Sequence, residues 1–234
     1  MWSEPRVPWS AFSGGGALAS SRAGQFDALR GVPCRTPVSR VYHRLHARFL
    51  RLAGGEAEAA QEAALTMLLQ PGLRMLDAGC GPATVARRLL ALEGGLQLTL
   101  LDKDPWMLAQ CRDLKATQVG GSLTKLPFRD CSFDVVFAFW SIETLADPGT
   151  GLRELVRVTR PGGWIAVTFC ARCPGIDWVD RCFQIAIGLR RSGRMLDPGA
   201  VQTALAEAGV AGIRHLHCRG PARAIIGQKG SDCH

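Results

Sequence analysis

The chain has 234 residues, of which 47% are hydrophobic, so it is long enough to form one domain of ordinary size with a substantial core. It contains no apolar run of the roughly 18 residues that a membrane-spanning helix requires, and residues 1–30 lack the apolar stretch of a signal peptide. The formal charge of +8 is uneven, because residues 1–50 carry seven arginines and two acidic residues, a net charge of +5. These features exclude a helical membrane-spanning protein and favour a cytoplasmic one, with peripheral contact to an acidic surface as an alternative for the basic segment.

The first part of the chain divides into two segments. Residues 1–37 are rich in Gly, Ser, Pro and Arg, which is typical of a disordered basic arm. Residues 38–72 are instead expected to form a helical cap. Its first helix, over residues 38–52, has apolar residues on one face and arginines off that face, and its second helix covers residues 56–69.

From residue 73 to residue 230, short apolar strand patterns alternate with helical patterns. Strands are expected over residues 74–78, 96–102, 117–121, 133–139 and 163–170, and helices over about 84–93, 105–114 and 149–159. Helices between consecutive strands imply right-handed crossovers, and therefore a parallel sheet that is covered on both faces.

The C-terminal part has helical patterns first and strand patterns last. A longer helix is expected over about 176–190. A second helix, capped by Asp197 and with a proline at its first position, follows over residues 198–208. Residues 213–217 and 222–227 then have the pattern of two strands joined by a turn.

Residues 75–84 have the order of strand, glycine-rich turn and helix start that nucleotide-type sites use. Gly79 and Gly81 would let the backbone approach a ligand without a Cβ in the way, and the helix beyond offers N–H groups and a positive dipole. Asp102 ends the next expected strand, as the dinucleotide-type pattern requires. Position 84 is Thr, however, where a third glycine would stand in G-x-G-x-x-G, and this points away from a dinucleotide.

The pattern Asp77-x-Gly79-x-Gly81 resembles motif I of the class I S-adenosylmethionine (SAM)-dependent methyltransferases. Three later segments strengthen the resemblance, namely residues 101–108 to the second motif, 121–136 to the "LPF…FDVV" segment and 157–163 to the "RVLKPGG" turn. This set is typical of the ubiquinone/menaquinone-type (type 11) subgroup. The resemblance implies a doubly wound, Rossmann-like α/β fold over residues 73–230, with a seven-stranded, mostly parallel sheet and an antiparallel C-terminal strand pair.

The resemblance also implies an activity, which is methyl transfer from SAM to a small, apolar or aromatic acceptor, with S-adenosylhomocysteine (SAH) as the product. Two alternatives remain open. One is a non-catalytic SAM- or SAH-binding protein of the same fold, and the other is an arsenite or thiol methyltransferase. The helices of residues 38–72 would cover the cofactor or shape the acceptor pocket, pack on the sheet edge, or touch a membrane surface. No nucleic-acid-binding module is recognised.

The family's motif positions identify the residues expected to hold SAM. The backbone at Gly79 and Gly81 would lie against the methionyl part, and Asp77 would bond the amino group or, alternatively, stabilise the turn. Asp102 would accept hydrogen bonds from both ribose hydroxyls, since a carboxylate offers two acceptor oxygens. The other expected cofactor contacts are Lys103 at the adenine, Ser122 and Leu123 where the family usually has an Asp and a small residue, and Phe139 and Ser141 after the fourth strand. Asp104 is expected to cap the helix that begins at Pro105 instead.

Glu143 lies near a position where relatives often have His, so it is a candidate acid/base or substrate-orienting group, or alternatively a solvated carboxylate at a helix start. The nine cysteines are interpreted as free thiols in a reducing cytosol. Cys170 and Cys173 have the spacing of metal ligands, with His215 and His217 as further candidates, but core and surface cysteines are the simpler interpretation and no metal site is expected.

Overall fold

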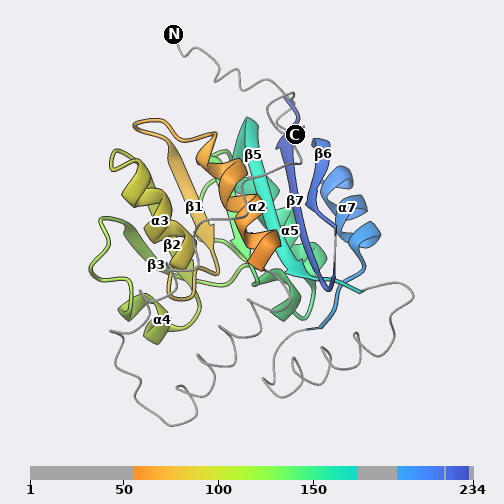
Figure 1. Cartoon of the computed structure of the whole chain (residues 1–234), viewed down its shortest axis with the longest axis horizontal. Helices are drawn as coiled ribbons and strands as arrows, with labels where there is room; N and C mark the ends of the chain where they lie inside the picture. The colour runs from red at the N-terminus through yellow and green to blue at the C-terminus, as the bar shows by residue number, and fades with distance from the viewer. Residues whose placement is uncertain (1–54, 173–193, 219, 232–234) are drawn as a thin grey trace.

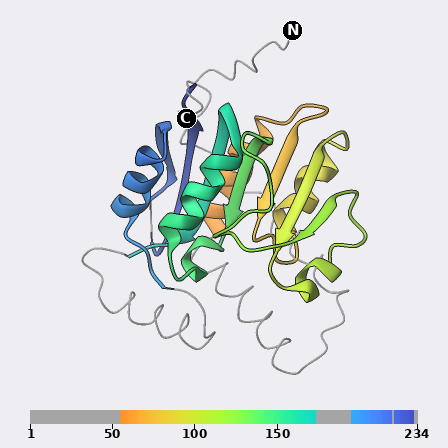
Figure 2. The ribbon, with the colours of Figure 1, turned by 180° about the vertical axis from the view of Figure 1, so that it is seen from behind.

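A single seven-stranded sheet forms the centre of the molecule, with helices on both of its faces (Figures 1 and 2). The computed structural model describes residues 55–172, 194–218 and 220–231. The strands are β1 (Arg74–Ala78), β2 (Gln97–Asp102), β3 (Thr117–Gly120), β4 (Phe133–Phe139), β5 (Thr159–Cys170), β6 (Val210–His217) and β7 (Ala222–Lys229). The helices are α2 (Gly55–Thr66), α3 (Thr84–Leu92), α4 (Pro105–Ala109), the 3₁₀ turn η3 (Ile142–Thr144), α5 (Pro148–Val158) and α7 (Pro198–Glu207).

The strand order β3-β2-β1-β4-β5-β7-β6 confirms the doubly wound fold. β1 pairs in parallel with β2 and with β4, and β4 pairs in parallel with β5. β7 is antiparallel to both β5 and β6, so the expected antiparallel C-terminal pair is also confirmed. The chain moves outward from β1 to β3 and then restarts at β4 on the other side of β1. Ligands of open α/β sheets bind beyond the carboxyl ends of the strands at such a reversal.

Two apolar layers attach the helices to the sheet. One layer lies under α2 and α3 and includes Leu65, Met75 and Leu89. The other lies under α5 and α7 and includes Leu76 and Leu155. Consecutive residues of β1 contribute to opposite layers because side chains alternate along a strand. Burial of both faces explains why the central strands are apolar at nearly every position.

The expected helix over 105–114 is wrong in its length. The helix α4 has the expected Asp104 cap, with the Trp106 N–H donating to the Asp104 carboxylate at 2.8 Å, but it ends at Ala109. Arg87 of α3 donates to the Gln110 carbonyl at 2.6 Å and to the Asp113 carboxylate at 2.8 Å. These contacts with a neighbouring helix hold the segment after Ala109 in turns.

Two strand starts and one helix end also differ from the expectation. β5 begins at Thr159, four residues before the expected start, because Thr159 pairs with Phe133 of β4. β6 begins at Val210, three residues early, because Val210 pairs with Lys229 of β7. The second cap helix, α2, ends at Thr66.

Three expectations fall on other parts of the chain. The arm of residues 1–37 and the helices over 38–52 and 176–190 lie outside the described residues. Within the described ranges, no helix combines the length and the apolar character needed to cross a membrane.

Candidate functional site

The residues expected to bind SAM gather at the carboxyl edge of the sheet, where the strand order reverses. Asp77 lies in β1, Asp102 ends β2, Phe139 ends β4, and Ser141 follows it. The Ser141 hydroxyl donates to the Ala78 carbonyl at 3.1 Å, so the segment after β4 is fixed against the end of β1. The sheet therefore brings the two carboxylates and the glycine turn to one place.

The two turn glycines have different roles in the structure. Gly79 has φ +76° and its missing side chain makes room for Ser141, since a Cβ at position 79 would lie 2.6 Å from the Ser141 Cβ and 3.2 Å from Leu123. Gly81 has φ +52°, and no atom of the described residues lies within 4 Å of where its Cβ would be. Close approach of a ligand to the backbone therefore fits Gly81, while Gly79 is required for packing within the protein.

Asp102 connects the glycine turn to the end of β2. Its Oδ2 accepts the Gly81 N–H at 2.8 Å, and its Oδ1 accepts the Asp104 N–H at 2.9 Å. The residue is half-buried. Because each carboxylate oxygen has two lone pairs, one acceptor site remains on each oxygen for a ribose hydroxyl.

Asp77 provides a buried carboxylate beside this turn, with only 4% of its surface exposed. Burial raises the pKa of its carboxyl well above the usual range, and the negative charges of Cys111, Asp102 and Glu58 raise that pKa further. Asp102 is the carboxylate that accepts a hydrogen bond from the turn. Among the described residues, Asp77 makes no such bond. A cation placed here would relieve the repulsion among these groups, so the site favours a positively charged ligand.

The expected adenine-side residues lie in or near the loop of residues 121–132. Leu123 is buried and lies close to Gly79. Ser122 is exposed, and its hydroxyl oxygen accepts the Thr124 N–H at 3.2 Å and lies 2.9 Å from the Thr124 hydroxyl. Lys103 is also exposed. Leu123 is therefore placed to offer an apolar surface next to the turn, whereas Ser122 stabilises its own loop.

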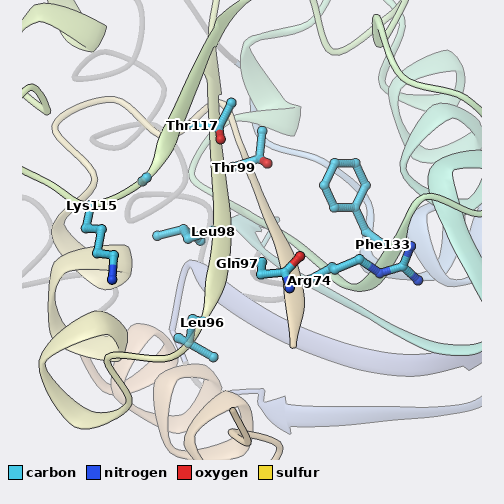
Figure 3. Close-up of a pocket in the computed structure, with 9 residues that line it drawn as sticks. Arg74, Leu96, Gln97, Leu98, Thr99, Lys115, Thr117 and Phe133 are labelled. Carbon is cyan, nitrogen blue, oxygen red and sulfur yellow. The ribbon is translucent and has the colours of Figure 1, made fainter. Parts of the chain in front are cut away.

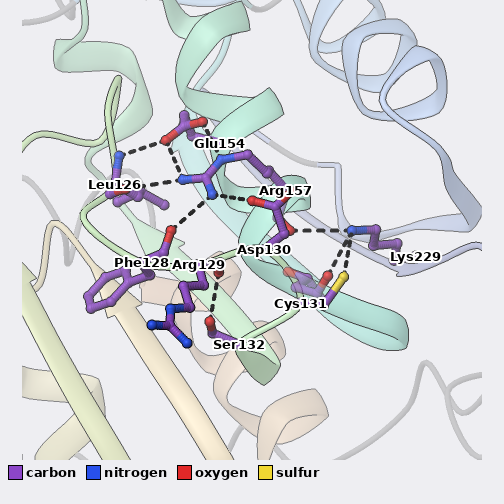
Figure 4. A network of polar contacts seen from close by, with 10 residues as sticks. Leu126, Phe128, Arg129, Asp130, Cys131, Ser132, Glu154, Arg157 and Lys229 are labelled. Atoms are coloured by element: carbon purple, nitrogen blue, oxygen red, sulfur yellow. Dashed lines mark hydrogen bonds and ion pairs between the residues drawn. The ribbon is translucent and has the colours of Figure 1, made fainter. Parts of the chain in front are cut away.

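Arg157 of α5 fixes this loop from behind (Figure 4). Its guanidinium donates to the carbonyls of Leu126 and Phe128 at 3.1 and 2.9 Å and to the Asp130 carboxylate at 2.6 Å. Glu154 accepts from Arg157 at 2.7 and 2.9 Å and from the Leu126 N–H at 2.6 Å. Arg157 is the first residue of the segment 157–163, whose sequence pattern predicts a turn but not this network.

Helix α2 is joined to the same end of the sheet by a contact between Glu58 and Trp140, which no sequence pattern predicted. Trp140 follows β4 with φ +53°, a conformation that is strained for a residue with a side chain, and its indole N–H donates to Glu58 of α2 at 3.1 Å. The other Glu58 oxygen accepts from Arg88 at 2.8 Å. A helical glutamate ordinarily indicates a solvated face, so no sequence pattern distinguished Glu58, which is only 9% exposed.

Glu143 lies in η3 and is 4% exposed. Its carbonyl accepts the Arg194 N–H at 3.0 Å, which ties this turn to the segment before α7. The interpretation of Glu143 as a solvated carboxylate is therefore wrong, while a role as an acid/base or orienting group stays a prediction.

The described candidates for a metal site, Cys170, His215 and His217, do not form one cluster. His215 bonds to Gln202 at 2.9 Å, and His217 lies 4.0 Å from Glu56. Cys170 is buried, and Cys173 lies outside the described residues. Among described side chains no group of three or more potential metal ligands occurs.

A hollow of about 500 Å³ lies at the opposite end of the parallel strands from the expected SAM site (Figure 3). It is lined by Arg74, Leu96, Gln97, Leu98, Thr99, Lys115, Ala116, Thr117 and Phe133. These residues lie in or just before the first halves of β1 to β4, so the hollow is at the amino ends of the strands and contains none of the residues expected to bind SAM.

Comparison with known structures defines the class of fold. The chain is similar to a SAM-dependent methyltransferase of Thermotoga maritima, described as a possible histamine N-methyltransferase, with a TM-score of 0.62 and 18% identity over 81% of this chain and 96% of that one. It is also similar to the [4+2]-cyclase SpnF, with a TM-score of 0.58 and 18% identity over 75% of this chain and 82% of the other. The protein has the class I methyltransferase fold, and at this level of identity the likeness shows the fold alone.

Sequence comparison then adds a family match. Residues 76–167 match the family described as "Methyltransferase domain", which supports a class I SAM-dependent methyltransferase of the type 11 group. It is 31% identical over 130 residues to a malonyl-[acyl-carrier protein] O-methyltransferase of Erwinia billingiae, which is 55% of this chain and 51% of the relative. It is 36% identical over 107 residues to a demethylmenaquinone methyltransferase of Mycobacterium sp. (strain KMS), which is 46% of each chain. The chain thus spans about half the length of these relatives. SAM is the cofactor of the family.

Proposed function

We propose that this protein transfers a methyl group from SAM to a small, apolar or aromatic acceptor and releases SAH. The observation that carries the proposal is that Asp77 near the end of β1 and Asp102, which bonds to the open Gly81, both lie at the reversal of strand order. The match of residues 76–167 to the methyltransferase domain family supports the reaction. Similarity to an enzyme named for demethylmenaquinone supports an acceptor with apolar character, while another relative is named for malonyl-[acyl-carrier protein].

The residues of this edge fit the parts of the cofactor. When bound, SAM supplies a methyl group that is already electrophilic because it is attached to a sulfonium. Asp77 would pair with the amino group and Asp102 with the ribose hydroxyls, while Leu123 would give the adenine an apolar neighbour. The main task left to the protein is to hold the acceptor in line with the methyl group and to exclude water. Glu143, two residues after Ser141, is the proposed acid/base or orienting group.

Ligand-dependent stability tests the choice of cofactor. SAM and SAH at a hundredfold excess over their Kd values should each raise the melting temperature of the full chain by about 5–10 °C, because a ligand that binds only the native state stabilises it. NAD at the same concentration should leave it unchanged, since Thr84 replaces the third glycine of a dinucleotide turn. An equal response to NAD would contradict the proposal.

Transfer of tritiated methyl from SAM into a metabolite extract tests the reaction itself. Label in a product that an organic solvent extracts would support the proposed acceptor class. Label that appears only when arsenite is added would replace it with thiol or metalloid methylation.

A second candidate is a non-catalytic SAM- or SAH-binding protein. The position of Ser122 favours it, because this residue stands where the family usually has an Asp and its hydroxyl is engaged with Thr124. A melting-temperature increase with SAM and no transfer to any acceptor would support this second candidate.

A further inference from the structure

Two buried cysteines meet beside the glycine turn. Cys80 belongs to the turn and Cys111 follows α4, and they are 8% and 0% exposed. The Sγ atoms of both lie 3.5 Å from the carbonyl oxygen of Gly81. The N–H of Gly81, in the preceding peptide group, donates to Asp102 at 2.8 Å. Gly81 therefore contacts two thiols through its carbonyl and the proposed ribose-binding carboxylate through its N–H.

The two thiols are not equivalent. Their mutual hydrogen bond lowers the pKa of Cys111, and the positive charge of Arg87 acts in the same direction. The same hydrogen bond and burial raise the pKa of Cys80. Cys111 is therefore the more readily ionised thiol, and the thiolate is the form of cysteine that reacts with oxidants.

We propose that Cys80 and Cys111 form a disulfide when a peroxide reaches the empty cofactor site, and that this disulfide lowers the affinity for SAM. The Cys111 thiolate attacks one peroxide oxygen, which forms a sulfenic acid and releases hydroxide, and this takes up a proton to give water. The Cys80 sulfur then attacks the Cys111 sulfur, an S–S bond forms, and the sulfenic oxygen leaves as a second water. In total, two thiols and one hydrogen peroxide give one disulfide and two waters.

The consequence for the cofactor follows from the contacts that Gly81 makes on both sides of its Cα. After oxidation the two sulfurs are bonded to each other, so their contacts with the Gly81 carbonyl must rearrange. The new bond also draws Cys80, and the turn with it, toward the end of α4, because the S–S length is only about 2.05 Å. The bond from the Gly81 N–H to Asp102, and with it the carboxylate that would hold the ribose, is then displaced. The link to SAM rests on the proposed function, whereas disulfide formation does not.

Peptide mapping tests the bond directly. Reduced full-length protein would be treated with one equivalent of hydrogen peroxide, blocked with N-ethylmaleimide and digested with trypsin without a reductant. The expected product is peptide 75–87 joined to peptide 104–112, each of which contains one cysteine. Saturating SAM should slow its formation at least fivefold, because bound cofactor covers the turn. Absence of this linked peptide would overturn the inference.

Titration of SAM tests the consequence. The oxidised protein should bind SAM at least tenfold more weakly than the reduced protein, and dithiothreitol should restore the affinity. Cys111→Ser should bind like the reduced wild type before and after peroxide, with Cys111→Ala as a second variant if the serine protein does not fold. Cys218→Ser, at an exposed cysteine, should behave as the wild type in both states.

The outcomes separate the two proposals. A linked peptide with unchanged SAM affinity would overturn the regulatory half of this inference. Failure of the reduced wild type to bind SAM would instead overturn the proposed function, while the linked peptide would still report on the disulfide.

Discussion

At the scale of single residues, the two site carboxylates are held in opposite ways. Asp102 is half-buried and both of its oxygens already accept backbone N–H groups. Asp77 is buried among negative groups, and this environment raises its pKa. The first arrangement supports a preformed acceptor for hydroxyl groups. The second stores electrostatic repulsion that a cationic ligand would release, which is a common feature of binding sites.

Substitution of Asp102 tests its role at the ribose. Asp102→Ala should weaken SAM binding by about 30–150-fold, or about 2–3 kcal/mol, because two charge-assisted hydrogen bonds are lost. Asp102→Asn should cost less, since the amide keeps one acceptor oxygen. Asp104→Ala is the matched control, because its side chain only caps α4 and its backbone N–H still reaches Asp102. Isothermal titration would decide, and a damaging Asp104→Ala beside a silent Asp102→Ala would contradict the assignment.

Asp77→Asn should separate stability from binding. A raised folded-state pKa means that the stabilising contribution is full below the unfolded pKa of about 3.9 and is lost as the pH rises through the folded pKa. At pH 7 the wild type without ligand therefore carries an electrostatic penalty that the amide removes. The variant should melt at a higher temperature than wild type at pH 7, with the difference vanishing near pH 4.

The same variant should bind SAM about 10–100-fold more weakly, because the amino group loses its charged partner. Thermal melts with and without SAM at both pH values measure both effects. A variant that is less stable at pH 7 but binds SAM normally would show that Asp77 serves the fold instead.

At the scale of elements, strands were predicted more accurately than the contacts between elements. The central parallel strands were recognisable because burial on both faces leaves continuous apolar runs, as in residues 133–139. The C-terminal end of α4 and the start of β5 were missed because long-range partners set them, namely Arg87 for α4 and Phe133 for β5. Local propensity contains no information about such partners.

The candidate site shows the same limit. Asp77, Gly79, Gly81 and Asp102 follow a motif of fixed spacing, and the fold brings them together as expected. Glu58 and Trp140 interact across 82 positions of sequence, so no local pattern revealed their pairing. The packing role of Gly79 likewise depends on Ser141, which arrives from β4.

Arg157 provides a test at this scale, because a single side chain joins α5 to the loop of residues 121–132. Arg157→Lys keeps the charge but loses the planar fork that reaches two carbonyls and two carboxylates. Since the side chain is 31% exposed, the expected loss of stability is only about 1–3 kcal/mol. SAM affinity should also fall about threefold to tenfold, as Leu123 is no longer held beside Gly79.

The control for this variant is Arg153→Lys on the same helix. Arg153 is 64% exposed and lies 3.8 Å from Asp147, so its replacement should change stability by less than about 0.5 kcal/mol. Urea unfolding and SAM titration of both variants measure the difference. Equal effects of the two substitutions would contradict a special role for Arg157.

At the scale of the whole molecule, the carboxyl ends of the strands form the candidate site, and their amino ends stabilise the fold. The carboxyl edge carries strained backbone at Trp140 and a carboxylate with a raised pKa, both of which cost stability. The amino ends of the strands carry an ionic cluster around the buried Asp134 instead. Asp134 of β4 accepts from the Arg74 backbone N–H at 2.9 Å, from its side chain at 3.1 Å and from Arg160 at 2.6 Å. This cluster joins the ends of β1, β4 and β5 on the side away from the proposed cofactor site.

Asp134→Asn should therefore destabilise the fold without affecting the site. Burial alone would raise the pKa of the Asp134 carboxyl, but the hydrogen bonds from Arg74 and Arg160 outweigh it and the pKa is lowered. A lowered folded-state pKa gives stability that is present above the unfolded pKa of about 3.9 and is lost as the pH falls through the folded pKa. Removing this buried charge should cost roughly 2–4 kcal/mol at pH 7, because two arginines lose their common partner.

Urea unfolding of wild type and Asp134→Asn at pH 7 and at pH 3 measures this cost. The difference between the two proteins should be largest at pH 7 and should shrink at pH 3, which lies below the unfolded pKa, so that the unfolded wild type binds a proton at this carboxyl and the folded state loses part of its advantage. SAM affinity at pH 7 and at a temperature where both proteins are folded should agree within about twofold, since Asp134 lies at the opposite edge from Asp77 and Asp102. A large loss of SAM affinity with unchanged stability would show that the two edges are coupled, and the separation of scaffold and site across the sheet would then be wrong.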